Sequence, residues 1–224
     1  TNCAVSGSAG ASSSDSVSNV GGLLGSSGYG SRKGKADKND TGMVNKTGGQ
    51  PSPAKLYNCS YSNMEISGVK NVGGFVGKLN SKSQGGVWTT GDMEIAKDST
   101  ITSTGANART GGVLGVIGDL FCVNVNPETK ATNANGTATI KNVNITATSS
   151  EGVGGLIGKV ESSVYAHGLH VIGSDSSASR MTVGKTGLSS VGGIAGYITG
   201  GDVFSFDSCK VKNIDLKATN CSGG

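Results

Sequence analysis

The chain has 224 residues, a length that suits either one large all-β domain or two small domains. Glycine is abundant, with 39 residues, whereas aromatic residues make up only 4% of the chain, which argues against a helical bundle or a doubly wound α/β core. The net charge of +4 is small and dispersed, and the one dense basic stretch, 31–38, is interrupted by Gly34 and Asp37, so we expect no nucleic-acid groove.

The segment 1–10, TNCAVSGSAG, lacks both the basic start and the apolar run of a signal peptide. No segment of the chain reaches the ~18 apolar residues of a membrane-spanning helix. We therefore expect no membrane insertion. Either a targeting sequence has been removed or the chain is a piece of a longer protein.

A short motif then recurs along the chain: two glycines, two apolar residues and a third glycine. It is present as NVGGLLG, NVGGFVG, RTGGVLG, GVGGLIG and SVGGIAG, and a sixth glycine pair closes the chain at Gly223. The repeat glycines are Gly21, Gly22, Gly25, Gly73, Gly74, Gly77, Gly111, Gly112, Gly115, Gly154, Gly155, Gly158, Gly192, Gly193 and Gly196. A constant motif at uneven spacing is typical of a solenoid, with a long loop insertion predicted here at 26–56.

A second element precedes the glycines. Segments 58–74 and 208–224 superpose without a gap, so that Cys59 falls on Cys209, and segment 138–155 fits with two extra residues. The apolar residues of these elements are mostly Val, Ile and Leu in short alternating runs, which is typical of strands. Each unit is therefore predicted to hold two or three short strands and a loop.

Units of this kind cannot bury an apolar face alone, so they stack in parallel, each strand ~4.8 Å from its counterpart in the next coil. Because crossovers between parallel strands are strongly right-handed, we predict a right-handed parallel β-helix. We expect five to six coils and one all-β domain over 1–224.

Alternation along a strand assigns faces to the Gly-Gly stretch. One side holds Gly73, Phe75, Gly77 and Leu79 and is predicted to be the interior, with Gly77 leaving room for side chains of the opposite wall. The other side, predicted to be the outer wall, carries an apolar ladder of Leu24, Val76, Leu114, Ile157 and Ala195. Exposed apolar ladders are uncommon, so it is covered either by the chain's own loops, such as 26–56, or by a partner in contact with it.

The VGGLhG core (h, an apolar residue), together with an Ile/Val-x-Asn-x-x-hydrophobic stretch, resembles the GLUG repeat, most closely where IKNVNI at 140–145 leads to VGGLIGKV at 153–160. GLUG repeats occur in bacterial cell-surface proteins, including adhesin-like proteins and non-catalytic parts of IgA-type metallopeptidases. The resemblance implies a structural role at the cell surface. The departures are the wide first interval and RTGGVLG, which lacks the leading valine. The zinc-binding HExxH helix of those peptidases has no counterpart, so no catalytic residue is carried over.

Residues that could carry chemistry are few. His167 and His170 are predicted to point to opposite faces of a strand, and His167 aligns with Cys59 and Cys209, which would give two ligands, too few for a closed zinc site. Acidic candidates for polysaccharide cleavage are Asp92, Glu94, Asp119, Asp202 and Asp207, which do not recur at matched ladder positions. We therefore expect no enzyme activity, no metal and no cofactor.

The five cysteines are Cys3, Cys59, Cys122, Cys209 and Cys221, without CxxC spacing. One or two disulfides and buried free thiols are both open.

The expected function follows from this architecture: a structural or adhesive rod on the extracellular bacterial surface, which displays its loops to a protein or glycan. The ends of a solenoid are unpaired strand edges. We therefore expect either further repeats in the native gene or end-to-end stacking of copies into a homo-oligomer or fibre. The alternative is a carbohydrate-binding or polysaccharide-degrading β-helix with a groove along an outer face.

Overall fold

The computed structural model describes residues 3–10, 19–27, 54–79, 85–118, 120–148, 150–176, 181–185, 190–200 and 203–218. Within these ranges the regular elements are all strands, which form four parallel sheets. The predicted insertion 26–56 falls largely outside the described residues; at its margins, 26–27 and 54–56 belong to strands. The basic stretch 31–38 and the final Gly223 also lie outside them.

Sheet 1 is formed by the long strands that precede the Gly-Gly motifs. It contains β1 (Cys3–Gly10), β5 (Cys59–Gly68), β9 (Asp92–Ser103), β13 (Thr137–Ala147), β17 (Leu169–Ile172), β18 (Met181–Lys185), β22 (Lys210–Lys212) and β23 (Ile214–Ala218). Sheet 2 contains the strands that run into the glycine pairs: β2 (Asn19–Gly21), β6 (Asn71–Gly73), β10 (Ala108–Gly111), β14 (Ser150–Gly154) and β19 (Val191–Gly192).

Sheets 3 and 4 complete each coil. Sheet 3 contains β3 (Leu24–Ser27), β7 (Val76–Leu79), β11 (Leu114–Ile117), β15 (Ile157–Val160) and β20 (Ala195–Ile198). Sheet 4 contains β4 (Ala54–Tyr57), β8 (Gly85–Trp88), β12 (Phe121–Val123), β16 (Val164–His167) and β21 (Phe204–Asp207).

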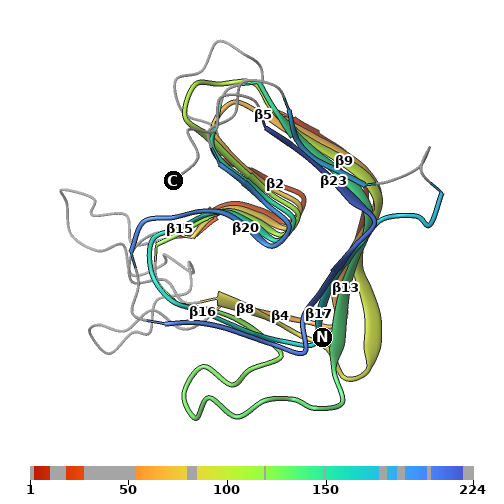
Figure 1. The fold of residues 1–224 in the computed structure, drawn as a ribbon, viewed down its shortest axis with the longest axis vertical. Coiled ribbons are helices and arrows are strands. Elements are labelled where there is room, and N and C mark those ends of the chain that lie inside the picture. Colours follow the sequence, from red (N-terminus) through yellow and green to blue (C-terminus); the bar gives the residue numbers. More distant parts are fainter. Residues whose placement is uncertain are drawn as a thin grey trace, which may run out of the picture.

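The chain passes through sheets 1, 2, 3 and 4 in turn and then returns to sheet 1 one coil further on, as Figure 1 shows. Five coils are complete, and β22 and β23 begin a sixth. The predicted right-handed parallel β-helix of five to six coils is confirmed. The view in Figure 1 looks down the solenoid, so the solenoid axis is the shortest dimension of the molecule.

The register of the sheets confirms the sequence repeat. The first glycines of the five motifs pair in one ladder: Gly21, Gly73, Gly111, Gly154 and Gly192. In sheet 1, one ladder joins Tyr61 to Val211 and another joins Ile66 to Leu216, each through the intervening coils. Cys59 and Cys209 therefore occupy equivalent positions, as their alignment predicts.

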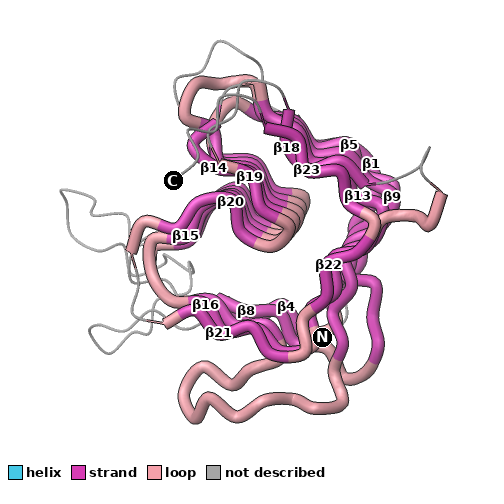
Figure 2. Tube along the Cα trace, in the orientation of Figure 1, coloured by secondary structure: helices cyan, strands magenta, loops and turns pink. Residues whose placement is uncertain are grey.

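Sheets 2 and 3 fold tightly against each other, and the turn between them projects into the centre of the coil (Figure 2). A Cβ atom on Gly73 would lie 2.1 Å from the carbonyl oxygen of Val76, and one on Gly77 would lie 2.5 Å from the amide nitrogen of Val20. Glycine is required because backbone meets backbone here. The space beside Gly77 is thus filled by the backbone of sheet 2, not by the side chains predicted from alternation.

The outer-wall placement of the apolar ladder is wrong. Val76, Leu114 and Ile157 are buried in the same core as Phe75 and Leu79, while Leu24 and Ala195, in the outer coils, are half-buried against it. The physical reason is that the motif forms two strands, β6 and β7, joined by a sharp turn. Alternation does not continue through a turn, so Val76 starts a new strand that faces the core.

Residues with positive φ form the bends of the coil. Sheet 1 bends at Asn63, Asp98, Asn142 and Asn213, with φ between 44° and 55°, and the corner from sheet 4 to sheet 1 uses Asn58, Asn124, Gly168 and Ser208. Asparagine and aspartate tolerate this left-handed region better than other side chains. The Asn142 side-chain amide also donates a 3.1 Å hydrogen bond to Asp98 one coil away. This bend accounts for the asparagine of the IKNVNI stretch.

Candidate functional site

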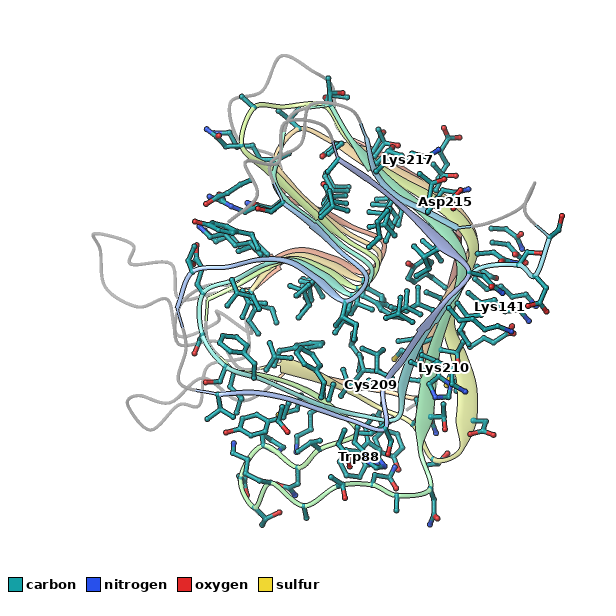
Figure 3. The ribbon with its side chains drawn as sticks, in the orientation of Figure 1. Trp88, Lys141, Cys209, Lys210, Asp215 and Lys217 are labelled. Atoms are coloured by element: carbon teal, nitrogen blue, oxygen red, sulfur yellow. The ribbon has the colours of Figure 1, made fainter. Side chains whose placement is uncertain are left out.

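A groove of about 200 Å³ lies on the outer face of sheet 4. It is lined by Lys55 and Tyr57 of β4, Gly85, Gly86, Val87 and Trp88 of β8, Cys122 of β12, and Val125, Asn126 and Pro127 of the following loop. Trp88, the only tryptophan of the chain, projects from the outer side of sheet 4, away from the core (Figure 3).

The parallel register builds the groove from three successive coils. Tyr57 is directly opposite Trp88, so two aromatic side chains follow each other on adjacent strands. Beside them, Gly86 lies between Lys55 and Cys122 in the same ladder. Since Val87 points into the core, Gly86 and Trp88 face outward, and the absent side chain of Gly86 leaves the backbone of β8 as a floor.

The loop 124–136 supplies the far wall. Val125 pairs with Thr132 in an isolated antiparallel bridge, and the Asn126 side chain accepts hydrogen bonds from the amides of Glu128 and Thr129 at 2.8 and 3.0 Å. Val125 also packs with Leu120, Cys122 and Tyr165 in a small apolar cluster separate from the main core. The wall is therefore fixed by local hydrogen bonds and by packing.

The charge in the groove lining comes from Lys55 of β4. Lys55 is exposed and is the sole charged residue of the lining, and no ion pair joins it to another residue of the described ranges. Burial raises the pKa of the Cys122 thiol to about 11, so this thiol stays neutral near pH 7. The groove therefore combines apolar aromatic walls with the Lys55 ammonium, and a second cation, Lys130, lies close enough to the far wall to act on Cys122 and to donate a hydrogen bond to the Pro127 carbonyl.

His167 is not placed where the sequence predicts. It lies opposite Asp207, with its Nδ1 2.7 Å from the Asp207 carboxylate, and this hydrogen bond lowers the pKa of Asp207. The residue in register with Cys209 is Leu169, because His170 pairs with Lys210. The alignment of His167 with the cysteines is off by two residues. Gly168 is the corner residue equivalent to Asn58 and Ser208, which directly precede the cysteines, so Leu169 takes the cysteine position.

No group of three or more His, Cys, Asp or Glu side chains suited to a metal ion occurs among the residues that the structure describes. Cys122 and Cys209 are free thiols.

The acidic candidates are dispersed. Asp92 and Glu94 lie on β9, Asp207 lies on β21, and Asp119 and Asp202 lie outside the described residues. Glu94 forms ion pairs with Lys141 at 2.7 Å and Lys97 at 3.0 Å, and these hydrogen bonds lower its pKa. Glu94 is therefore an ionised surface carboxylate held by two lysines.

A denser ionic cluster lies beside sheets 2 and 3. The Glu151 carboxylate accepts hydrogen bonds from Arg109 Nε and Lys159 Nζ, both at 2.6 Å, and Lys159 also pairs with Glu161 at 3.1 Å. Burial opposes ionisation of Glu151, but the hydrogen bonds from Lys159 and Arg109 outweigh it and lower its pKa. The bond between Arg109 and Glu151 joins neighbouring coils. The two cations of the cluster are paired with its two carboxylates, so we do not assign a ligand to it.

The C-terminal coil exposes its core. Five large apolar side chains there are 36–52% exposed: Ile198, Phe204, Phe206, Val211 and Leu216. Their ladder partners one coil earlier, Val160, Val164, Ala166, Val171 and Val183, are at most 2% exposed. The same positions that are buried inside the stack thus form an apolar surface at its end.

Comparison with known proteins gives no relative: no family model, no curated protein and no solved structure matches the chain. The resemblance to GLUG repeats therefore stays a prediction. The described residues contain no helix that is long and apolar enough to cross a membrane.

Sequence reasoning did not single out the residues of the groove. Lys55, Tyr57 and Trp88 belong to no repeated motif, and the groove exists only because three coils bring them together. The one available signal was a single tryptophan after a glycine pair, GGVW at 85–88, in a chain otherwise poor in aromatic residues.

Proposed function

We propose that the chain is a non-enzymatic structural module of an extracellular bacterial surface protein, which supports adhesive loops and engages a protein or glycan on another surface. The observation that carries the proposal is the stack itself, in which five coils share one core and four parallel sheets. Each coil of a solenoid contacts only its neighbours, so such a stack serves as a scaffold of adjustable length.

The distribution of loops supports the adhesive part of the proposal. The strands of sheet 3 are four residues long in every coil, whereas chain length varies in the connections, above all between β3 and β4 and between β12 and β13. Loops carried on a rigid framework are where binding residues are most often found. The resemblance to GLUG repeats supports placement at the cell surface.

The shape of the solenoid favours extension along its axis. The axis is the shortest dimension of the molecule, so the five coils alone are too short to act as a rod. The apolar end formed by Ile198, Phe204, Phe206, Val211 and Leu216 is suited to cover by further coils of a longer native chain or by a second copy. A two-fold end-to-end contact gives a closed dimer, and a head-to-tail contact gives an open fibre. Either assembly buries this end.

The adhesive role is tested with purified, fluorescently labelled protein on bacterial and animal cells and on immobilised matrix proteins. The matched variant replaces residues 28–53 by a short Gly-Ser linker. We expect saturable retention of the unmodified protein on at least one surface and weaker retention of the variant at unchanged melting temperature. Retention on none of these surfaces, or specific turnover of a polysaccharide, would overturn the proposal.

A further inference from the structure

The aromatic pair Tyr57 and Trp88 stands out on the outer wall of the solenoid. Tyr57 is 39% exposed and Trp88 is half-buried, although both have large apolar surfaces that the core could bury. They occupy paired positions of β4 and β8 and line the same groove. Two aromatic side chains at paired positions, next to a floor without a side chain, form a surface against which a flat ligand can pack.

Ligand sites in proteins combine mostly apolar walls with a few polar groups that fix orientation. Here the polar groups are the Lys55 ammonium, the Tyr57 hydroxyl and the Asn126 amide, together with backbone at Gly86. A sugar ring matches such a site, since it has an apolar C–H face for the aromatic rings and polar substituents at its edge. The free cation specifies the charge of the ligand, because Lys55 faces no carboxylate within the described lining.

We propose that this groove binds an acidic saccharide, with a pyranose ring packed against Trp88 and Tyr57 and a ring carboxylate paired with Lys55. The inference deepens the proposed adhesive function and rests on it, since it names the ligand class of an attachment module. Nucleobases also stack on aromatic side chains. However, nucleic-acid binding draws its affinity from many cations, whereas this groove has Lys55 in its lining and Lys130 beside its far wall.

The single tryptophan makes the site directly measurable, because all tryptophan emission of the full chain comes from Trp88. The protein is titrated with oligogalacturonate, with a neutral maltooligosaccharide of equal length and with a single-stranded oligothymidylate. We expect a saturable change of emission with oligogalacturonate, and affinity weaker by about fivefold or more for the neutral sugar, which lacks the charge-assisted contact.

Two groove variants and one control separate the contribution of the Lys55 charge to saccharide binding from that of the Tyr57 ring. Lys55→Gln is expected to lower the affinity for oligogalacturonate to that for the neutral sugar, whereas Tyr57→Ala lowers both. Lys210→Gln, on the outer face of sheet 1 (Figure 3), removes an exposed lysine elsewhere and is expected to change neither affinity. Circular dichroism melting checks that each variant is folded.

No emission change with oligogalacturonate at millimolar concentration overturns the inference, as does tighter binding of oligothymidylate or an unchanged affinity of Lys55→Gln. The adhesive function has its own test, which is the retention of labelled protein on cells and matrix proteins. Retained adhesion with no saccharide binding removes only the groove assignment, whereas absent adhesion with saccharide binding removes the proposed attachment role and leaves a saccharide-binding groove.

Discussion

The Tyr61 hydroxyl donates a 2.5 Å hydrogen bond to the carbonyl oxygen of Gly112, which ties sheet 1 to the Gly-Gly turn of the next coil. The Tyr61 ring also meets Phe75 edge to face, with ring centroids 5.1 Å apart, and Tyr61 is fully buried. One side chain thus joins the outer sheet of the coil to the turn that projects into its centre.

Removing this hydroxyl in Tyr61→Phe leaves the Gly112 carbonyl without that partner in the core. We expect the free energy of unfolding to fall by about 1–2 kcal/mol, the usual cost of a buried polar group that loses its hydrogen bond. Urea denaturation measures this loss of stability. The midpoint urea concentration should fall, while the dependence of the unfolding free energy on urea stays the same. A variant as stable as the unmodified protein would contradict a role for this bond.

Stability at alkaline pH follows from the same residue. Burial raises the pKa of Tyr61 far above its ordinary value of 10.0, so the phenol stays protonated in the folded state while it ionises in the unfolded state. Above pH 10 the unfolded state binds fewer protons, and stability falls by up to ~1.4 kcal/mol per pH unit for this group. The free energy of unfolding, measured from pH 9 to 11.5, should show this decline. In Tyr61→Phe the part of the decline that Tyr61 contributes should be absent.

The glycine pair gives a second test with a matched control. In Gly73→Ala the added methyl group would lie 2.1 Å from the Val76 carbonyl oxygen, whereas at Gly91 no atom lies within 4 Å of the added position. We expect Gly73→Ala to destabilise by roughly 3 kcal/mol or more, because backbone must move, and Gly91→Ala to be nearly neutral. Thermal melting compares them. Equal melting temperatures would show that the turn tolerates a side chain.

Ile157 tests the corrected placement of the apolar ladder. Ile157 is fully buried, so Ile157→Ala should cost about 2–5 kcal/mol through lost packing and a cavity. Leu216→Ala, at a 52% exposed position, should cost much less. Denaturant titration separates the two. A neutral Ile157→Ala with altered self-association would restore the earlier outer-wall assignment.

End-to-end assembly predicts that charge on the apolar end blocks association. Phe206→Lys combined with Leu216→Lys places two ammonium groups on this surface, since both residues are exposed. We expect sedimentation velocity to show dimers or fibres for the unmodified protein and monomers for the double variant. Monomeric unmodified protein at millimolar concentration would rule out stacking through this end.

Much of the fold could be predicted because the repeat is regular. The glycine ladder and the equivalence of Tyr61 with Val211 follow from aligning segments of the chain, since stacked coils place like residues together. The orientation of Val76 could not be predicted in this way. A turn of two residues separates β6 from β7, and the sequence VGGFVG reads equally well as one continuous strand.

The candidate site was less accessible to sequence reasoning. Trp88 and Tyr57 are 31 residues apart and meet only because the chain makes one full coil between them. His167 illustrates the opposite error, because the alignment did not match the corner residue Gly168 with the corner residues Asn58 and Ser208. Local sequence patterns predict the strands well. Which residues pair between coils depends on the positions of the corner residues, and these are harder to identify from the sequence.

The direction of the hydrogen bonds has a mechanical consequence for the stack of coils. The bonds between coils run along the solenoid axis, so tension along that axis acts equally on every coil interface, and each interface can separate independently of the others. Coils would then peel singly, and the coil between Gly73 and Gly111 would release about 130 Å of contour length at ~3.4 Å per residue. Under load, the stack would therefore lengthen in steps.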